Sequence, residues 1–530
     1  MKKILLFLII IIGLWGSSCK KYLDINNNPN SPTSSSPNLI LPLAIVNTAS
    51  LVSSLNDYGS QTVGYAANAG GYGGFGASWT YNYTTSAGDG YWSFGYTTLE
   101  NFQTIINSTQ GSDANIYYNA SSKVMEAYIF QLLVDEFNDV PYTQALQGNN
   151  NLRPTYDKAS DIYVSLASLL DSAIIEINNG QAATVAPTAL TSGTDPLFGG
   201  NMTKWKQFAN TLKLRLIVRA SAAAQFANTN FSSDGFLTDD AVVNPGYKLA
   251  SGQVSPSWNS WVASYTGSRQ GNAWIPSTYV FGYYDGHKLL DTFRGKAIYY
   301  AFPQTPVNSL GFLPPNNTLT SPSNAGAWYS GGGSGTGLGG AIGIMKGPDM
   351  GEPLMLLAES DFLQAEADIR GILNQDAATD FNNGILASFT YLYKDPSNSV
   401  ASNLNPAADE AQYLADNASS YLVNFNLATT ADQQTEAIIT QKYIALNFIH
   451  GQESWNEYRR TGYPATSGPT FNTPSGSSDP YGSFTSTQSQ GTRPDKLPTR
   501  LPYPDTETQT NGTNVPQGIS VFTSTIFWAH

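Results

Sequence analysis

The stretch that decides the fold class is Asp157–Ile177, which reads DKASDIYVSLASLLDSAIIEI. Its apolar side chains recur at intervals of three and four residues: Ile162, Leu166, Leu169, Leu170, Ala173, Ile174 and Ile177. This spacing puts them on one face of an α-helix, and that face must be buried against a neighbouring element. Asp157 precedes the stripe and is a residue type that caps helix N-termini, so we expect the helix to begin there.

The same pattern returns in other parts of the chain. Apolar segments that predict helices occur at 39–55, 125–137, 205–219, 354–369 and 438–449. We expect Pro353 to stand in the first turn of one helix and Gly371 to close it, and Gly451 to end the last one. Helices joined by short links stack as hairpins, so the sequence predicts a mostly α-helical, tetratricopeptide-like scaffold.

Long irregular stretches separate these helices, at 58–96, 234–351 and 462–530. Tyr58–Tyr96 alone holds ten glycines and eleven aromatic residues in 39 positions. Loops of this length are usually functional or disordered, and disordered segments are poor in aromatics. The sequence therefore predicts a large, loop-rich portion that carries function.

The first eighteen residues are typical of a secretion signal. Lys2 and Lys3 form a positive start, Ile4–Ile12 is an unbroken apolar run, and small residues from Gly16 precede Cys19. The apolar run is too short to span a membrane, which takes about twenty residues. The arrangement resembles a bacterial lipoprotein signal and predicts lipid attachment at Cys19, although Gly16 occupies the position where leucine is usual.

The segment after Cys19 is rich in Asn, Ser and Pro, including INNNPNSPTSSS at 25–36, and it cannot pack a core. We therefore expect three parts. Residues 1–18 are a signal peptide, residues 19–36 are the lipidated cysteine with a flexible tether, and residues 37–530 are one domain. In that domain, a helical-repeat scaffold carries loop-rich insertions that bind ligand.

Composition excludes several classes of function. The formal net charge is −13 and charged residues are only 12% of the chain, which argues against a nucleic-acid binder because such proteins need a basic surface. A single cysteine excludes an intrachain disulfide and a cysteine-based metal site, and three histidines make a histidine-rich one unexpected. We predict no metal and no cofactor.

The aromatic residues of the loops suggest the ligand. A sugar ring has an apolar face of C–H groups, which stack on aromatic rings, and a rim of hydroxyls, which amide and carboxylate groups can bind. Glycine allows the backbone to approach a ligand closely. The residues that we predict to contact ligand lie in or near the glycine-rich loops: Trp79, Trp92, Trp274, Tyr283, Tyr284 and Trp328.

A paired-carboxylate site is the alternative that would make this protein an enzyme. Glu359 and Glu366 are seven residues apart, two turns along one helix face, and a glycosidase needs two carboxyl groups about 5–10 Å apart. Carboxylates in an apolar helix more often pair with arginine, and Arg459 and Arg460 are the candidate partners. A secreted glycoside hydrolase therefore stays an alternative, as does a purely structural surface protein.

Several segments in sequence order resemble one family, that of the SusD/RagB outer-membrane nutrient-binding lipoproteins of Bacteroidetes. They are CKKYLDINNNPNSPT from Cys19, WKQFANTLKLRLIVR (205–219), EPLMLLAESDFLQAEADIRG (352–371), IITQKYIALNFIHGQESWNEYRRTGYP (438–464) and RLPYPDTE (500–507). The fourth is the most specific of them. The matches run from Cys19 to Glu507, so they cover nearly the whole mature chain.

This resemblance implies a surface-exposed lipoprotein of the outer membrane that has no catalytic activity. It implies a helical fold that covers a SusC-like TonB-dependent transporter barrel, captures a nutrient and delivers it to that barrel. The nutrient of the family is most often an oligosaccharide, and in some members it is a peptide. The family motifs do not identify the ligand residues, so our six candidates rest on the aromatic pattern alone.

Overall fold

The computed structural model describes residues 36–220, 222–313, 328, 341–466 and 480–530. The predicted signal peptide, Cys19 and the tether up to residue 35 lie outside the described residues.

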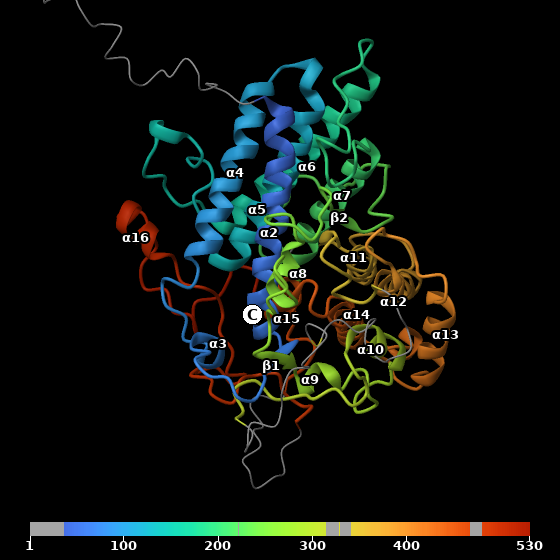
Figure 1. Ribbon diagram of the computed structural model, residues 1–530. Coiled ribbons are helices and arrows are strands. Elements are labelled where there is room, and N and C mark those ends of the chain that lie inside the picture. Colours follow the sequence, from blue (N-terminus) through green and yellow to red (C-terminus); the bar gives the residue numbers. More distant parts are fainter. Residues whose placement is uncertain (1–35, 221, 314–327, 329–340, 467–479) are drawn as a thin grey trace, which may run out of the picture.

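The amino-terminal helices pack side by side (Figure 1). They are α2 (Pro37–Thr62), α4 (Asp89–Thr109), α5 (Ile116–Phe137), α6 (Ala159–Ala182) and α7 (Met202–Ala220). α4 packs on α5, α5 on α6 and α6 on α7, while α2 lies against α4. Consecutive helices therefore form hairpins, as the sequence predicts for this scaffold.

The carboxy-terminal helices form a second group (Figure 1). They are α11 (Leu357–Ile369), α12 (Ala377–Tyr393), α13 (Pro406–Asp416), α14 (Ala431–Ala445) and α15 (Gly451–Thr461). α11 packs on α12, α14 and α7, and α15 packs on α2, so both groups share one core. The mostly α-helical fold class is confirmed.

The crossing of α2 and α15 depends on two glycines. A Cβ atom on Gly59 would lie 2.1 Å from the Gln452 backbone nitrogen, and one on Gly451 would lie 2.3 Å from the Ser60 nitrogen. Neither backbone could approach so closely with a larger residue. α2 is long and apolar enough to cross a membrane, but it is mostly buried and packs on α4 and α15 as a core helix does.

Three of the predicted helix boundaries are wrong. Lys158, not Asp157, caps α6, because the Asp157 carboxylate accepts hydrogen bonds from the Tyr142 and Thr143 backbone nitrogens instead. Pro353 lies in a strand before α11, and Gly451 opens α15 rather than ending α14. In each case a tertiary contact, which no local pattern reports, determines where the helix begins or ends.

Short elements and loops make up most of the remainder. Strand β1 (Ala66–Asn68) pairs antiparallel with β3 (Trp274–Pro276), and β2 (Ala241–Val243) pairs with β4 (Glu352–Met355). The short helices are α3 (Ala77–Thr80), α8 (Pro256–Trp261), α9 (Thr278–Phe281), α10 (Thr292–Ile298) and α16 (Asp505–Asn511). The two small sheets tie distant loops together and thereby position the aromatic residues described next.

Candidate ligand-binding site

Two of the predicted ligand residues, Trp79 and Trp274, meet around Phe75. The Phe75 and Trp79 rings stack with centroids 4.6 Å apart and an interplanar angle of 14°, and the Trp274 ring meets Phe75 edge-on at 5.0 Å. Trp261 lies behind Trp274, with ring centroids 6.5 Å apart. We call Phe75, Trp79, Trp261 and Trp274 the aromatic platform.

Backbone pairing assembles the platform from segments about 200 residues apart in sequence. Asn68 of β1 lies opposite Trp274 of β3 in the ladder, which brings the loop after β1 next to Trp274. The Ser78 hydroxyl donates to Gln61 Oε1 at 2.7 Å and thereby holds α3, which carries Trp79, to the end of α2. The platform therefore rests on regular elements although its residues come from loops.

The loop that carries Phe75 is open to solvent. Tyr72 is 43% exposed, and the neighbouring positions 71, 73, 74 and 76 are exposed glycines. Gly76 has φ +52° where it precedes α3, a conformation that L-residues rarely adopt. The Phe75 and Trp274 side chains are half-buried and Trp79 is 8% exposed, so the platform is well packed and still reaches the surface.

Polar groups at the platform lack protein partners. Within the part of the chain that the structure describes, the buried Trp79 Nε1 and Asn272 Oδ1 have no hydrogen-bond partner. Buried polar atoms are nearly always paired, with protein, water or ligand. Trp79 Nε1 is therefore a donor on a platform ring that no described protein group satisfies, and Asn272 stands two residues before Trp274 in the sequence.

A carboxyl group stands behind the platform. Asp57 of α2 accepts a hydrogen bond from Trp261 Nε1, and burial raises the pKa of Asp57 to about 7. Desolvation disfavours the charged form, and this outweighs the stabilisation that the Trp261 hydrogen bond gives it. The Asp57 carboxyl beside Trp261 therefore loses its proton and becomes negatively charged close to pH 7.

The other predicted ligand residues do not join the platform. Tyr284 is 0% exposed, and its hydroxyl accepts from Asn447 Nδ2 at 2.9 Å. Tyr283 is buried against Tyr443, and Trp328 is buried with its ring edge-on to Tyr300 at 5.8 Å. All three side chains are buried and pack on neighbouring aromatic rings, so they contribute to the core in this structure.

Trp92 lies elsewhere, on α4. It is buried among Tyr96, Phe137, Tyr156 and Tyr503, with ring centroids 5.0 to 6.2 Å from its own. The structure therefore places Trp79 and Trp274 on the platform, Trp92 on α4, and Tyr283, Tyr284 and Trp328 at other buried positions.

One of the paired carboxylates has a predicted arginine partner. Glu366 makes two contacts with Arg460, at 2.6 and 2.7 Å, which confirms that pairing. Arg459 instead pairs with Glu136 at 3.2 Å, because it lies on the side of α15 that faces the end of α5. Both pairs are buried in the protein core.

The other carboxylate, Glu359, is fully buried and has different partners. Arg215 lies 3.3 Å and Lys442 lies 3.7 Å from its Oε1. The charges of Lys442 and Arg215 overcome the desolvation cost and lower the pKa of Glu359 to about 2. Glu359 and Glu366 therefore hold the core together, and no sugar could reach them.

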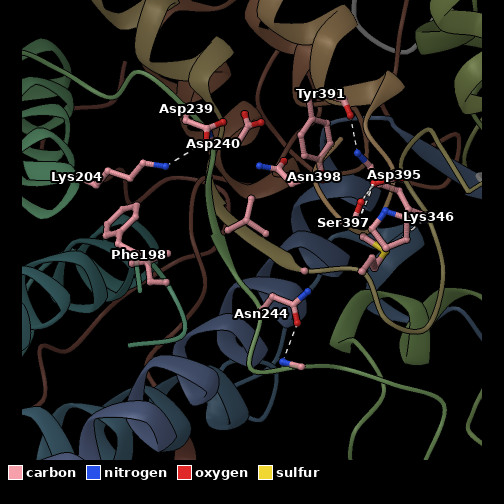
Figure 2. Close-up of a pocket in the computed structure, with 16 residues that line it drawn as sticks. Phe198, Lys204, Asp239, Asp240, Asn244, Lys346, Tyr391, Asp395, Ser397 and Asn398 are labelled. Carbon is pink, nitrogen blue, oxygen red and sulfur yellow. Dashed lines mark hydrogen bonds and ion pairs between the residues drawn. The ribbon is translucent and has the colours of Figure 1, made fainter. Parts of the chain in front are cut away.

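A separate cavity of about 480 Å³ opens between β2 and the end of α12 (Figure 2). Its charged side chains are paired within the protein. Asp239 accepts from Lys204 at 3.2 Å and from Lys394 at 3.0 Å. Lys346 donates at 2.5 Å to the Tyr391 carbonyl in the last turn of α12, and burial lowers the pKa of Lys346 to about 7. The geometry assigns these charges to the fold, so the platform is the stronger candidate for ligand binding.

Metal binding has no support in the described ranges. Among residues 36–220, 222–313, 328, 341–466 and 480–530, no three His, Cys, Asp or Glu side chains lie together as an ion would require.

Some residues of this site have no distinctive signal in the sequence. Phe75 was one of many aromatics in a glycine-rich loop, and only its contacts show that it links Trp79 to Trp274. No sequence signal pointed to Asp57, because its contact with Trp261 joins residues about 200 positions apart.

Two family models together match most of the chain. The family described as "Starch-binding associating with outer membrane" matches residues 29–245, and "Susd and RagB outer membrane lipoprotein" matches residues 344–525. The chain belongs to this SusD/RagB family of outer-membrane lipoproteins. It is thus a nutrient-binding protein of the outer membrane and not an enzyme.

Solved structures agree on the fold. A SusD homologue from Bacteroides fragilis is 21% identical, with a TM-score of 0.64 over 94% of this chain and 100% of its own. A SusD/RagB family protein from Bacteroides thetaiotaomicron is 20% identical, with a TM-score of 0.65 over 93% and 99% of the two chains. A chitin-binding SusD homologue from Flavobacterium johnsoniae is 20% identical, with a TM-score of 0.62 over 92% and 98%. A search of curated proteins finds no match.

Proposed function

We propose that this protein captures a neutral oligosaccharide on the aromatic platform and delivers it to a TonB-dependent transporter of the SusC kind. The observation that carries the proposal is the cluster of Phe75, Trp79 and Trp274, in which Phe75 and Trp274 are half-buried and Phe75 belongs to a solvent-exposed glycine loop. Stacked and edge-on aromatic rings present flat apolar area to which the C–H face of a sugar is complementary.

The polar groups of the platform support a sugar as the ligand. Trp79 Nε1 has no partner among the described residues, and a ligand hydroxyl that reaches it can accept its hydrogen bond. Sites built to hydrogen-bond a hydroxyl discriminate strongly against ligands that lack it. The neutral ligand fits a chain with few charged residues, and one structural neighbour is described as chitin-binding.

The anchor and the partner complete the proposal. Lipid on Cys19 would hold the protein at the outer membrane, and several acyl chains on one residue anchor stably where a single chain does not. Residues 20–36 would then act as the tether. A stable complex with a transporter barrel buries at least about 1,600 Å² in total, for which the loop-rich portion offers ample surface.

An array of glycans and peptides tests the ligand class. The probe is the full chain with Cys19→Ala, which removes the lipid site and leaves the described residues unchanged. We expect binding to neutral glycans. Binding to peptides alone would show that the ligand is a peptide and not a glycan. Binding to neither would indicate a structural surface protein. Co-purification from native membranes tests the partner, which we expect to be a transporter barrel.

A further inference from the structure

A second cavity, also of about 480 Å³, lies beside α4. Three segments form it: α4, the loop 141–154 and α16. The loop is the teal segment beside α4 in Figure 1, and α16 lies below it. The lining residues include aromatic, amide and carboxylate side chains: Trp92, Tyr96, Glu100, Asn101, Gln147, Asn151 and Glu507.

One face of α4 forms the floor of this cavity. Trp92, Tyr96 and Glu100 are spaced four residues apart, which places them one above the other on the helix surface. The Tyr96 hydroxyl donates to the Pro141 carbonyl at 2.7 Å, which fixes its ring and joins the helix to the first residue of the loop. An aromatic floor is therefore held in place before any ligand arrives.

The loop that forms the wall is closed at its base. Val140 and Asp157 form an antiparallel bridge, and the Asp157 carboxylate accepts from the Tyr142 and Thr143 backbone nitrogens at 2.8 and 2.9 Å. Farther out, Asn151 Nδ2 donates to the Gln144 carbonyl at 3.1 Å. The carboxylate that the sequence suggested as a helix cap thus organises the wall of the cavity.

The polar groups of the cavity favour a polyhydroxylated ligand without negative charge. Glu507 is fixed by the Tyr156 hydroxyl, which donates to Oε2 at 2.9 Å, while the Glu100 side chain is exposed. Among the described lining residues there are two carboxylates and no lysine, arginine or histidine. An anionic ligand would be repelled, whereas hydroxyl groups can donate to the carboxylates and to the amide oxygens. Leu152, 72% exposed, adds apolar surface at the rim.

We infer that this cavity is a second saccharide site, which binds a neutral sugar unit against the Trp92–Tyr96 face of α4. The inference rests on the proposed function, because it assigns the same class of ligand to a second position.

The test separates the two sites with single substitutions in the Cys19→Ala chain. Thr97 is exposed on α4 and lines the cavity, so Thr97→Trp fills the cavity without touching the core. Thr104, exposed on the same helix and outside the lining, provides the matched control Thr104→Trp. Ligand-detected NMR measures affinity for chitohexaose, maltohexaose, cellohexaose and, as the anionic probe, hexagalacturonate.

We expect Trp274→Ala to leave residual binding of a neutral hexasaccharide. Adding Thr97→Trp should weaken this residual binding more than tenfold, Thr104→Trp should leave it unchanged, and hexagalacturonate should not compete. Loss of all binding in Trp274→Ala would overturn the second site and support the platform. If Trp274→Ala has no effect and Thr97→Trp abolishes binding, the cavity is supported and the platform is overturned. Failure of all neutral probes to bind the parent chain would contradict both.

Discussion

The guanidinium of Arg460 meets the carboxylate of Glu366 at two points, Nη1 to Oε1 at 2.6 Å and Nη2 to Oε2 at 2.7 Å. The pair joins α15 to α11 in the buried centre of the molecule. The Glu457 carboxylate lies against the same guanidinium, and its pKa is held well below the usual range by Arg460 and by Lys442. The core of this protein is therefore built on paired charges as well as on apolar packing.

Removing one member of this pair should be costly. Glu366→Gln removes one of the two negative charges that face the buried Arg460 guanidinium. We therefore expect the free energy of unfolding to fall by about 3–5 kcal/mol. Urea denaturation of the Cys19→Ala chain measures this effect. Glu176→Gln, which breaks a partly exposed pair with Lys123, should cost at most about 1 kcal/mol. Equal effects of the two substitutions would contradict the structural role of the Glu366 pair.

Asp57 should make the platform sensitive to pH. Its pKa is raised to about 7, so the folded state keeps a proton that the unfolded chain releases above about pH 3.8. The contribution of this group to stability is therefore full below about pH 3.8, falls as the pH rises to about 7 and is lost above that pH. We expect Trp fluorescence to titrate near pH 7, and Asp57→Asn, which keeps an oxygen acceptor for Trp261, to abolish that transition. An unchanged transition in Asp57→Asn would assign it to another group.

Gly76 should be required for the shape of the platform loop. Its φ of +52° and ψ of −121° before α3 are strained for any residue with a Cβ, so Gly76→Ala should cost about 1–3 kcal/mol or displace Phe75. Gly90, exposed in α4 with open space around it, is the matched control. Gly90→Ala should be neutral or stabilise by up to about 1 kcal/mol. Thermal unfolding distinguishes them, and tolerance of both would show that the loop does not need this conformation.

Cys19 should determine where the protein resides in the cell. In cells fed radioactive palmitate we expect label on the natural chain and none on Cys19→Ala, which should leave the membrane fraction. Label on Cys19→Ala, or its retention in the membrane, would contradict lipid attachment at this residue.

The sequence predicts the helices far better than the site, for physical reasons. The apolar stripe from Ile162 to Ile177 reports burial of one helix face, and α6 is where it predicts. α15 gives no such signal, because Glu453, Glu457 and Arg460 look like a solvated surface in sequence and are buried in the structure. Their partners lie on other helices. The affinity of arginine for carboxylates pointed to Arg460, but no local pattern marked Glu453 or Glu457 as buried.

The sequence also does not distinguish ligand residues from core residues. Trp274 and Tyr284 lie ten residues apart in the same loop-rich region and look equivalent in sequence. The pairing of β1 with β3 leaves Trp274 half-buried beside Phe75, whereas Tyr284 is enclosed by Asn447 and Tyr299. Local pattern cannot distinguish an aromatic side chain that faces solvent from one that fills the core, since that difference is set by tertiary pairing.

The central claim is that the aromatic platform holds the ligand, and calorimetric titration of Trp274→Ala tests it most directly. Tyr265, 50% exposed and outside the platform, provides the control Tyr265→Ala. With the best glycan from the array, we expect Trp274→Ala to lose about 2 kcal/mol of binding free energy, roughly a thirtyfold rise in Kd, and to unfold as the parent chain does. Tyr265→Ala should bind like the parent. Equal Kd values for the parent and a folded Trp274→Ala would contradict the account.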